Sequence, residues 1–173
     1  MPNGLLEEII TENNKSNIQV NQVKNTHGNY PFFTSGDAIL EFNEYFVDNF
    51  NCFLNTGGNA DVKCYYGKAA YSTDTWSITG KNNYSIYLYL LLSFIKSELQ
   101  VKYFLGTGLK HLQKPMLKKK TIYIPTTNEV QLLNQYLEPV FKMISNNNDE
   151  NVKYKKLRNY LLPLLINGQA TIS

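Results

Sequence analysis

Cysteine and histidine are scarce in this sequence, with two of each among 173 residues. Cys52 and Cys64 do not have the Cys-x-x-Cys spacing of a zinc site, and neither His27 nor His111 has an acidic residue at a metal-ligand spacing. The sequence therefore predicts no metal ligand and no disulfide scaffold. We interpret both cysteines as small core residues.

Recognisable catalytic and nucleotide-binding loops are also missing. The stretch GTGLKHLQKPMLKKKTIYIP at 106–125 has glycines followed by lysines, but it lacks the Gly-Lys-Ser/Thr ending of a phosphate-binding loop, and a dinucleotide fingerprint would need glycine where His111 stands. There is no Gly-x-Ser-x-Gly elbow and no Asn/Asp-Pro-Pro-aromatic methyltransferase motif. The sequence predicts no catalytic residue and no cofactor. A scattered Ser/Asp triad stays open as the weakest interpretation, and binding without catalysis is favoured.

Apolar runs long enough to cross a membrane are also missing from the sequence. The longest, YSIYLYLLLSFI at 84–95, is followed by Lys96 and Glu98 and falls well short of the roughly 20 residues that a membrane span needs. We expect a buried helix over 84–100 and no membrane association. The amino terminus has no basic region followed by an apolar stretch, so we expect a cytoplasmic protein.

Charge is divided unevenly along the chain. Residues 1–95 contain five Lys and nine acidic residues, whereas residues 96–173 contain twelve Lys or Arg and five acidic residues. A basic second half is typical of a protein with a polyanionic partner, although lysines also serve only to keep a surface soluble. Both interpretations stay open on charge alone.

Short β-rich runs between clusters of Gly, Asn and Asp predict an irregular, mostly antiparallel sheet; they occupy 30–33, 38–42, 52–55, 61–66, 69–72 and 75–79. The segment NTGGNAD at 55–61 has the chemistry of a hairpin turn, because adjacent glycines allow positive φ. A last strand at 121–124 is closed by Pro125. With the buried helix, these elements predict an α+β domain over residues 1–125.

The pattern after Pro125 is helical. Heptad-like spacing joins Val130, Leu133, Leu137, Val140 and Ile144, and it resumes out of phase at Tyr154, Leu157, Leu161 and Leu164 until Asn167 and Gly168 stop it. Pro139 is expected to kink this segment or start a new one, and the polar patch 145–151 interrupts it. An α-hairpin and a long broken helix fit equally well. The segment either packs on its own domain or forms an arm whose apolar stripe needs a partner.

Four sequence blocks resemble, together and in order, the specificity subunit of type I restriction-modification systems. They are GNYPFFTSG at 28–36, FLNTGGNADVKCYYGKAAYSTDTW at 53–76, the stretch at 106–125, and LRNYLLPLLINGQ at 157–169. The resemblance covers most of the chain. It departs from the family at the short start MPNGLLEEII, which lacks a tryptophan often found after it, and at Pro139, which puts the straightness of the helix in doubt.

The resemblance implies a DNA target recognition domain at 1–125 and a helical spacer and dimerisation region at 126–173. Such subunits choose the DNA sequence and are not enzymes, whereas separate modification subunits methylate adenine and separate restriction subunits cut. Family members usually carry two recognition domains, so this chain is similar to a half-length subunit. A homodimer would then read a bipartite target in double-stranded DNA, using the apolar residues Leu133, Leu137, Val140, Ile144, Leu157, Leu161 and Leu164.

With DNA as the partner, glycines in the 106–125 stretch let the backbone approach the duplex. Lysine can donate to guanine, and Asn or Gln can bond adenine, so Lys110, Gln113, Asn55 and Asn59 are candidates for base readout. The full set of candidate DNA-binding residues is Thr34, Ser35, Asn55, Asn59, Lys63, Lys68, Thr107, Lys110, His111, Gln113 and Lys114. Each is otherwise a surface turn residue.

Other interpretations stay open. Aromatic residues could stack on a flipped base, but core packing is the favoured role for Tyr30, Phe32, Tyr65, Tyr66 and Trp76. A free-standing DNA-binding regulator or restriction decoy would use the same domain without a modification subunit. A coiled-coil interaction protein would use only the helical stripe. Copurification with a modification subunit and salt-dependent DNA binding separate these alternatives.

Overall fold

A four-stranded antiparallel sheet lies at the centre of the computed structural model, which describes residues 1–24, 26 and 28–169. In order across the sheet, its strands are β2 (Ile10–Glu12), β8 (Thr75–Gly80), β5 (Phe50–Asn55) and β6 (Val62–Tyr66). Cys52 in β5 lies opposite Cys64 on one side and Ile78 on the other. The turn at 55–61 joins β5 to β6 as a hairpin, which confirms the prediction for this segment.

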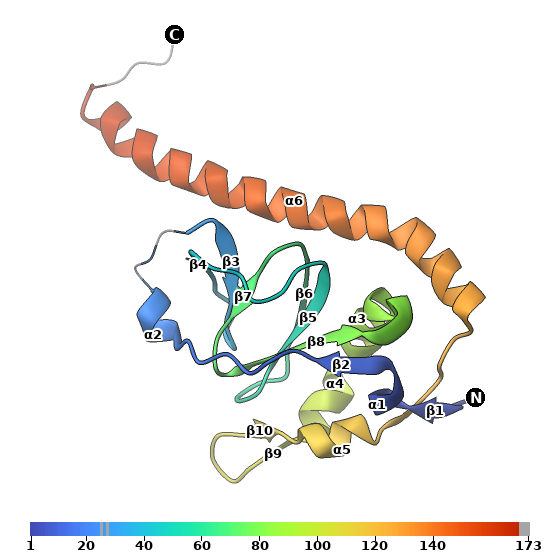
Figure 1. Cartoon of the computed structure of the whole chain (residues 1–173). Coiled ribbons are helices and arrows are strands. Elements are labelled where there is room, and N and C mark those ends of the chain that lie inside the picture. The colour runs from blue at the N-terminus through green and yellow to red at the C-terminus, as the bar shows by residue number, and fades with distance from the viewer. Residues whose placement is uncertain (25, 27, 170–173) are drawn as a thin grey trace.

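A second, three-stranded sheet packs beside the first (Figure 1). Its strands are β4 (Ile39–Phe42), β3 (Tyr30–Phe33) and β7 (Ala70–Tyr71), with β3 and β7 parallel. Aromatic rings join the two sheets, and Phe33 of β3 stacks on Phe53 of β5 with centroids 4.1 Å apart. The predicted α+β class with a mostly antiparallel sheet is confirmed. Three of the aromatic residues considered for base stacking are core residues: Phe32, Tyr65 and Trp76.

The first twelve residues contain two short strands and a helix, elements that the sequence patterns did not predict. Strand β1 (Gly4–Leu5) pairs with β11 (Thr121–Ile122), helix α1 (Leu6–Ile9) follows, and β2 then pairs with β8. Leu6 and Ile9 of α1 are buried in the main core. The amino-terminal segment therefore ties the two ends of the α+β domain together. Helix α2 (Val20–Val23) comes next and buries Val23.

The predicted buried helix is divided into shorter pieces. The turn η1 (Lys81–Asn83) leads into α3 (Ser85–Phe94), which is followed by α4 (Lys96–Glu98) and a π-helical turn, η2 (Leu99–Tyr103). Leu88 and Leu92 of α3 are fully buried, whereas Phe94 at its end is 89% exposed. One face of this segment therefore builds the core. Strands β9 (Phe104–Leu105) and β10 (His111–Leu112) and helix α5 (Lys114–Lys118) complete the domain.

One continuous helix, α6 (Thr127–Ile166), forms the rest of the described chain. Thr126 and Glu129 cap its start reciprocally, because the Thr126 hydroxyl accepts from the Glu129 backbone N–H and the Glu129 carboxylate accepts from the Thr126 N–H at 2.7 Å. Neither Pro139 nor the 145–151 patch ends it, so the α-hairpin interpretation is wrong. Its 40 residues span about 60 Å.

Asn167 and Gly168 end α6, as the sequence predicts. Gly168 has a φ of 66°, and its backbone N–H donates to the Leu165 carbonyl, while the Gln169 N–H donates to the Leu164 carbonyl at 2.8 Å. This pair of bonds is a Schellman motif, which needs a residue that tolerates positive φ. Figure 1 shows that α6 runs along one side of the molecule, on the side away from β9 and β10, and that its end reaches past the sheets.

The first half of α6 packs on its own domain. Phe141 contacts the rings of Phe50 and Tyr89, with centroids 5.1 and 5.4 Å apart. The Ser145 hydroxyl, inside the polar patch, accepts a hydrogen bond from the Tyr66 backbone N–H at 2.8 Å. The patch therefore helps to dock the helix, although the sequence pattern indicated an interruption there.

A second docking contact comes from the same patch. The Tyr65 hydroxyl donates to the Asp149 carboxylate at 2.6 Å. Burial and the neighbouring Asp149 charge raise the pKa of the Tyr65 phenol, so the hydroxyl keeps the proton that it donates.

Among the described residues, none of the helices combines the length and apolar content that crossing a membrane requires.

Ser145→Ala is expected to lower the free energy of unfolding by about 1–3 kcal/mol, because it leaves the Tyr66 backbone N–H buried without a partner. Urea unfolding measures this difference. Asn146→Ala is the matched control, since Asn146 is the exposed neighbour on the same helix. Equal unfolding midpoints for the two variants would contradict the docking role of Ser145.

Candidate nucleic-acid interface

The β9–β10 hairpin presents the glycine-containing loop 106–110. Leu105 pairs with His111, and the strands are anchored by Phe104 and Leu112, whose side chains are buried. Gly106 has a φ of 151°, and a Cβ atom there would lie 2.7 Å from the Leu109 carbonyl oxygen. A residue with a side chain would therefore strain the loop at this position. The buried strand ends hold the loop in place while its residues stay exposed.

The hairpin lies against the β5–β6 turn. The Gly58 backbone N–H donates to the Lys110 carbonyl at 2.9 Å, and the Leu112 N–H donates to the Thr56 carbonyl at 3.0 Å. Gly57 forms an isolated bridge with His111. Two segments that are about fifty residues apart in the sequence, and that were each predicted to contact DNA, therefore form one continuous surface.

The predicted residues on this surface differ in how free their side chains are. Thr107 and Lys110 are exposed in the loop, His111 is exposed at the start of β10, and Asn59 is exposed in the turn. Asn55 is buried instead, and its amide donates to the Asn59 carbonyl at 3.1 Å, so it shapes the turn. Its side-chain oxygen has no protein partner.

Gln113 and Lys114 connect the hairpin to α5. The Gln113 side-chain amide donates to the His111 carbonyl at 3.1 Å. The Lys114 ammonium lies 5.1 Å from the centroid of the Trp76 ring, a cation–π contact. Both side chains are partly buried, so they border the loop rather than extend from it.

Three predicted residues form a separate group around the turn that follows β3. The Thr34 hydroxyl is buried and donates to the Ala38 carbonyl at 2.7 Å, and the Lys63 ammonium donates to the carbonyls of Thr34 and Gly36 at 2.9 and 2.5 Å. Burial lowers the pKa of Lys63, and Asp61 opposes this shift. Thr34 and Lys63 therefore stabilise the turn from inside, while Ser35 is half-buried within it.

Lys68 lies away from both groups. It follows β6, at the end of the β5–β6 hairpin opposite the 55–61 turn, and its ammonium is 4.6 Å from the centroid of the Tyr45 ring. The structure does not bring Lys68 onto the surface that contains Lys110. No group of three or more His, Cys, Asp or Glu side chains that could hold a metal ion occurs among the described residues.

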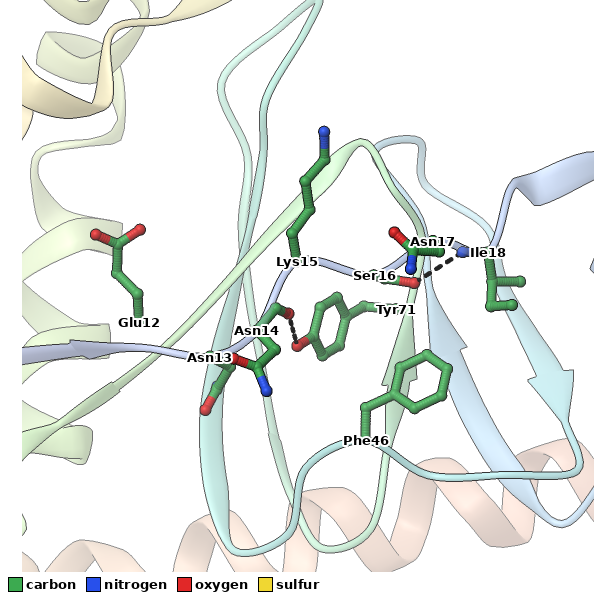
Figure 2. A pocket seen from close by; sticks show the side chains of 9 residues that line it. All are labelled: Glu12, Asn13, Asn14, Lys15, Ser16, Asn17, Ile18, Phe46 and Tyr71. Carbon is green, nitrogen blue, oxygen red and sulfur yellow. Dashed lines mark hydrogen bonds between the residues drawn. The ribbon is translucent and has the colours of Figure 1, made fainter.

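Sequence reasoning missed the polar segment 13–17, NNKSN, which lines a cavity of about 620 Å³ together with Phe46 and Tyr71 (Figure 2). A neighbouring cavity of about 310 Å³ connects this segment with Thr56 of the β5–β6 turn and with Lys114. The only signal in the sequence was an uninterrupted run of amide, hydroxyl and lysine side chains directly after the β2 residues.

The predicted dimerisation stripe is divided by the structure. Leu133 and Leu137 are partly buried against the main core, so they belong to the docked face of α6. The others lie outside the core: Val140 is 46%, Ile144 45%, Leu157 51% and Leu161 36% exposed, and Leu164 is partly buried.

A continuous exposed seam keeps the spacing of the second predicted block, which begins at Tyr154, and extends it back to Tyr136 in a phase different from that of the first block. Alternating steps of four and three residues connect Tyr136, Val140, Met143, Asn147, Glu150, Tyr154, Leu157, Leu161 and Leu164. All of its apolar members except Leu164 are more than one third exposed. The seam is the unpartnered face of α6, and Asn147 and Glu150 are polar steps within it.

Comparisons with known proteins agree on one family. A family model described as the type I restriction modification DNA specificity domain matches residues 5–155. A curated relative, the specificity subunit of the type I restriction enzyme MjaIX from Methanocaldococcus jannaschii, is 32% identical over 93 residues, which cover 53% of this chain and 21% of that protein.

Two solved structures share the fold. The S subunit of a type I restriction-modification system from M. genitalium superposes with a TM-score of 0.67 at 14% identity, covering 94% of this chain and 44% of that one. A structure concerned with complex assembly and conformational transition of the type I R-M system gives 0.57 at 13% identity, covering 92% and 44%. The chain thus spans less than half the length of these relatives.

Proposed function

The chain belongs to the family of type I restriction modification DNA specificity domains, and from that membership we propose that it is a half-length specificity subunit that selects the DNA sites on which partner subunits act. The observation that carries this proposal is the joining of two glycine-containing loops, 55–61 and 106–110, into one exposed polar surface. Loops held by a rigid sheet are well suited to present side chains to a duplex.

We assign base readout to the exposed part of this surface. Lysine donates to guanine O6 and N7 in the major groove, and amide side chains bond adenine, so Lys110 and Asn59 are the leading readers, with Thr107, His111 and Gln113 beside them. The glycines allow the backbone to come close to the DNA. We assign an indirect role to Thr34, Asn55 and Lys63. Their side chains form hydrogen bonds inside the turns, so they stabilise the turn conformations and do not contact bases.

We propose that the chain performs no chemistry itself. Adenine methylation belongs to a modification subunit, and translocation and cutting belong to restriction subunits recruited through it. The recognition domain is proposed to span residues 1–125 and the helical spacer residues 126–173. The exposed seam of α6 is the surface available for assembly, because the opposite face of the first half of the helix is docked on the sheets.

We further propose that two copies form an antiparallel twofold dimer through the exposed seam of α6. This would place two identical recognition domains at opposite ends, so the target would be two inverted copies of one half-site separated by an unread spacer. Asn147 and Glu150 would restrict the register, because polar steps in an apolar seam specify alignment at some cost in stability.

Lys110→Ala is expected to reduce discrimination between cognate and non-cognate DNA by about 1–3 kcal/mol, because one good base contact is lost. Site preference of the complex reconstituted with a modification subunit measures the change. Lys153→Ala is the control with the same loss of charge, since Lys153 is exposed on α6, a helix that runs along the side of the molecule away from the β9–β10 hairpin. If affinity falls equally for all sequences, Lys110 contacts phosphate; if methylation at the cognate site is unchanged, the loop has no role in readout.

A further inference from the structure

The segment 13–17 has a backbone that is fixed at its amino-terminal end. The Asn13 backbone N–H donates to the Ser77 carbonyl at 3.1 Å. The Asn13 side-chain amide donates to the Asn51 side-chain oxygen and to the Ser77 hydroxyl, both at 2.9 Å. The Asn13 amide is therefore engaged inside the protein, and its hydrogen bonds hold the start of the segment on the central sheet.

The middle and far end of the segment are fixed as well. The Tyr71 hydroxyl donates to the Asn14 carbonyl at 2.5 Å, and Figure 2 shows this bond beneath the segment. The Thr73 backbone N–H donates to the Ile18 carbonyl at 2.9 Å, and Ser16 is buried with its hydroxyl accepting from the Ile18 N–H. The chain between these points cannot move far without breaking several bonds.

The remaining side chains of the segment make no hydrogen bond or ion pair with the part of the chain that the structure describes. Asn14, Lys15 and Asn17 are exposed, and Figure 2 shows the Lys15 side chain extended away from Tyr71 with its ammonium at the end. Because the backbone around Lys15 is already fixed, less conformational entropy of the chain is lost when an anion binds to the Lys15 ammonium. This arrangement differs from an ordinary solvated lysine on a mobile loop.

Lys15 shares a cavity with a second lysine. Lys15 and Lys114 both line the cavity of about 310 Å³, together with Thr56 and Thr73. Among the ion pairs of the described residues, neither of these two ammonium groups takes part. The lysines therefore leave positive charge at this cavity that the protein does not pair.

The two carboxylates at the cavity do not remove this charge. Glu12 is occupied, since it accepts from the Trp76 indole N–H at 2.8 Å and pairs with Lys118. Although burial works to raise the pKa of Glu12, the bonds from Lys118 and Trp76 hold it below its ordinary value. Asp74 is exposed at the rim, and it forms no ion pair among the described residues.

The surroundings also make Lys114 receptive to an anion. Burial lowers the pKa of its ammonium; Glu12 opposes this shift, and Lys15 and Lys118 add to it. A bound anion would stabilise the charged form of Lys114 further, by adding to the negative charge that Glu12 supplies.

The cavity adjoins the surface proposed to read DNA. Thr56 lines it and also accepts, through its carbonyl, the hydrogen bond from Leu112 of the β9–β10 hairpin. We propose that Lys15 and Lys114 form a backbone-phosphate site that anchors the DNA duplex beside the 106–110 loop. This inference rests on the proposed function, and it assigns positioning of the duplex to a segment distinct from the loop that reads bases.

Binding of a fluorescently labelled random-sequence duplex to the full chain, measured at a series of KCl concentrations, tests the site. Each phosphate contact contributes about 0.9 to the log–log salt slope, so Lys15→Ala and Lys114→Met should each reduce the slope by about 0.9, and the double variant by about 1.8. Methionine at 114 keeps an apolar stem against Trp76. Lys15→Arg should keep the slope, and Lys153→Ala is the control variant.

Thermal unfolding of each variant verifies that the fold is intact. If the unaltered chain has a steep salt slope and Lys15→Ala and Lys114→Met have the same slope, the phosphate site is wrong while the proposed function stands. If the unaltered chain has no salt-dependent binding to the duplex, both the phosphate site and the proposed function are wrong. A reduced slope that Lys15→Arg restores supports the site.

Discussion

A chain carrying Leu157→Asp and Leu161→Asp is expected to be a monomer where the unaltered chain is a dimer. Both leucines lie on the exposed seam of α6 and are 51% and 36% exposed in the single chain. In a twofold dimer each substitution occurs twice, so the interface would bury four carboxylates. Burial of an unpaired charge costs several kcal/mol, so the dissociation constant should rise on the order of 1000-fold or more.

Light scattering at tens of micromolar chain, an order of magnitude at which a stable dimer should persist, measures the mass directly. The matched control is Leu162→Asp with Asn159→Asp, because Leu162 is also 51% exposed but lies off the seam on the same helix. The control should stay dimeric. A monomeric unaltered chain, or a seam variant that remains dimeric, would contradict the seam as the interface. Leu137 is unsuitable for this test, since it packs on its own core and its loss would destabilise the domain.

The chain on its own is proposed to have no methyltransferase activity. The purified chain alone is expected to transfer no labelled methyl groups to DNA above the protein-free background, and addition of its modification subunit is expected to give robust transfer. The sequence carries no cofactor loop and no adenine-methylation motif, and methylation is proposed to belong to the partner.

The seam variant Leu157→Asp with Leu161→Asp extends this experiment. If the dimer aligns two recognition domains on one bipartite site, methylation by the reconstituted complex should fall sharply with the seam variant and not with its off-seam control. Robust methyl transfer by the purified chain alone would contradict the non-catalytic assignment.

Local sequence patterns were sufficient to predict the strands between residues 30 and 79. Each predicted run is rich in β-branched or aromatic residues and bounded by turn residues, and each became a strand of β3 to β8. The start of the chain was not predictable in this way. Strands β1 and β2 have two and three residues, and their partners β11 and β8 are distant in the sequence, so no local pattern could signal the pairing.

The helical region shows a different limit. Leu133 and Leu137 satisfy heptad spacing as well as Tyr136 and Val140 do, and only the position of the sheets determines which set is docked. The polar residues Ser145 and Asp149 looked like an interruption because their hydrogen-bond partners, Tyr66 and Tyr65, lie on β6. Spacing in the sequence identifies a stripe, but burial against other elements decides its role.

The candidate site was predictable in part. Glycine and lysine marked the 106–110 loop, and the 55–61 turn was visible from its own residues, but their contact through Gly58 and Lys110 depends on the fold. Lys15 stands in a polar run that has no pattern of its own, so no local signal singles it out. In the folded chain, Lys15 and Lys114 line the same cavity, whose walls come from four separate stretches of the chain.

Sequencing of all methylated sites in cells that express this chain with its modification subunit tests whether a dimer of the chain selects the sites. Methylated adenines are expected at a split palindrome, with two inverted copies of one half-site and a spacer of fixed length, present only when this chain is expressed. Methylation that does not depend on the chain, as a free-standing regulator or decoy would give, would contradict the account. A site whose halves differ in sequence, with no second specificity chain present, would contradict it as well.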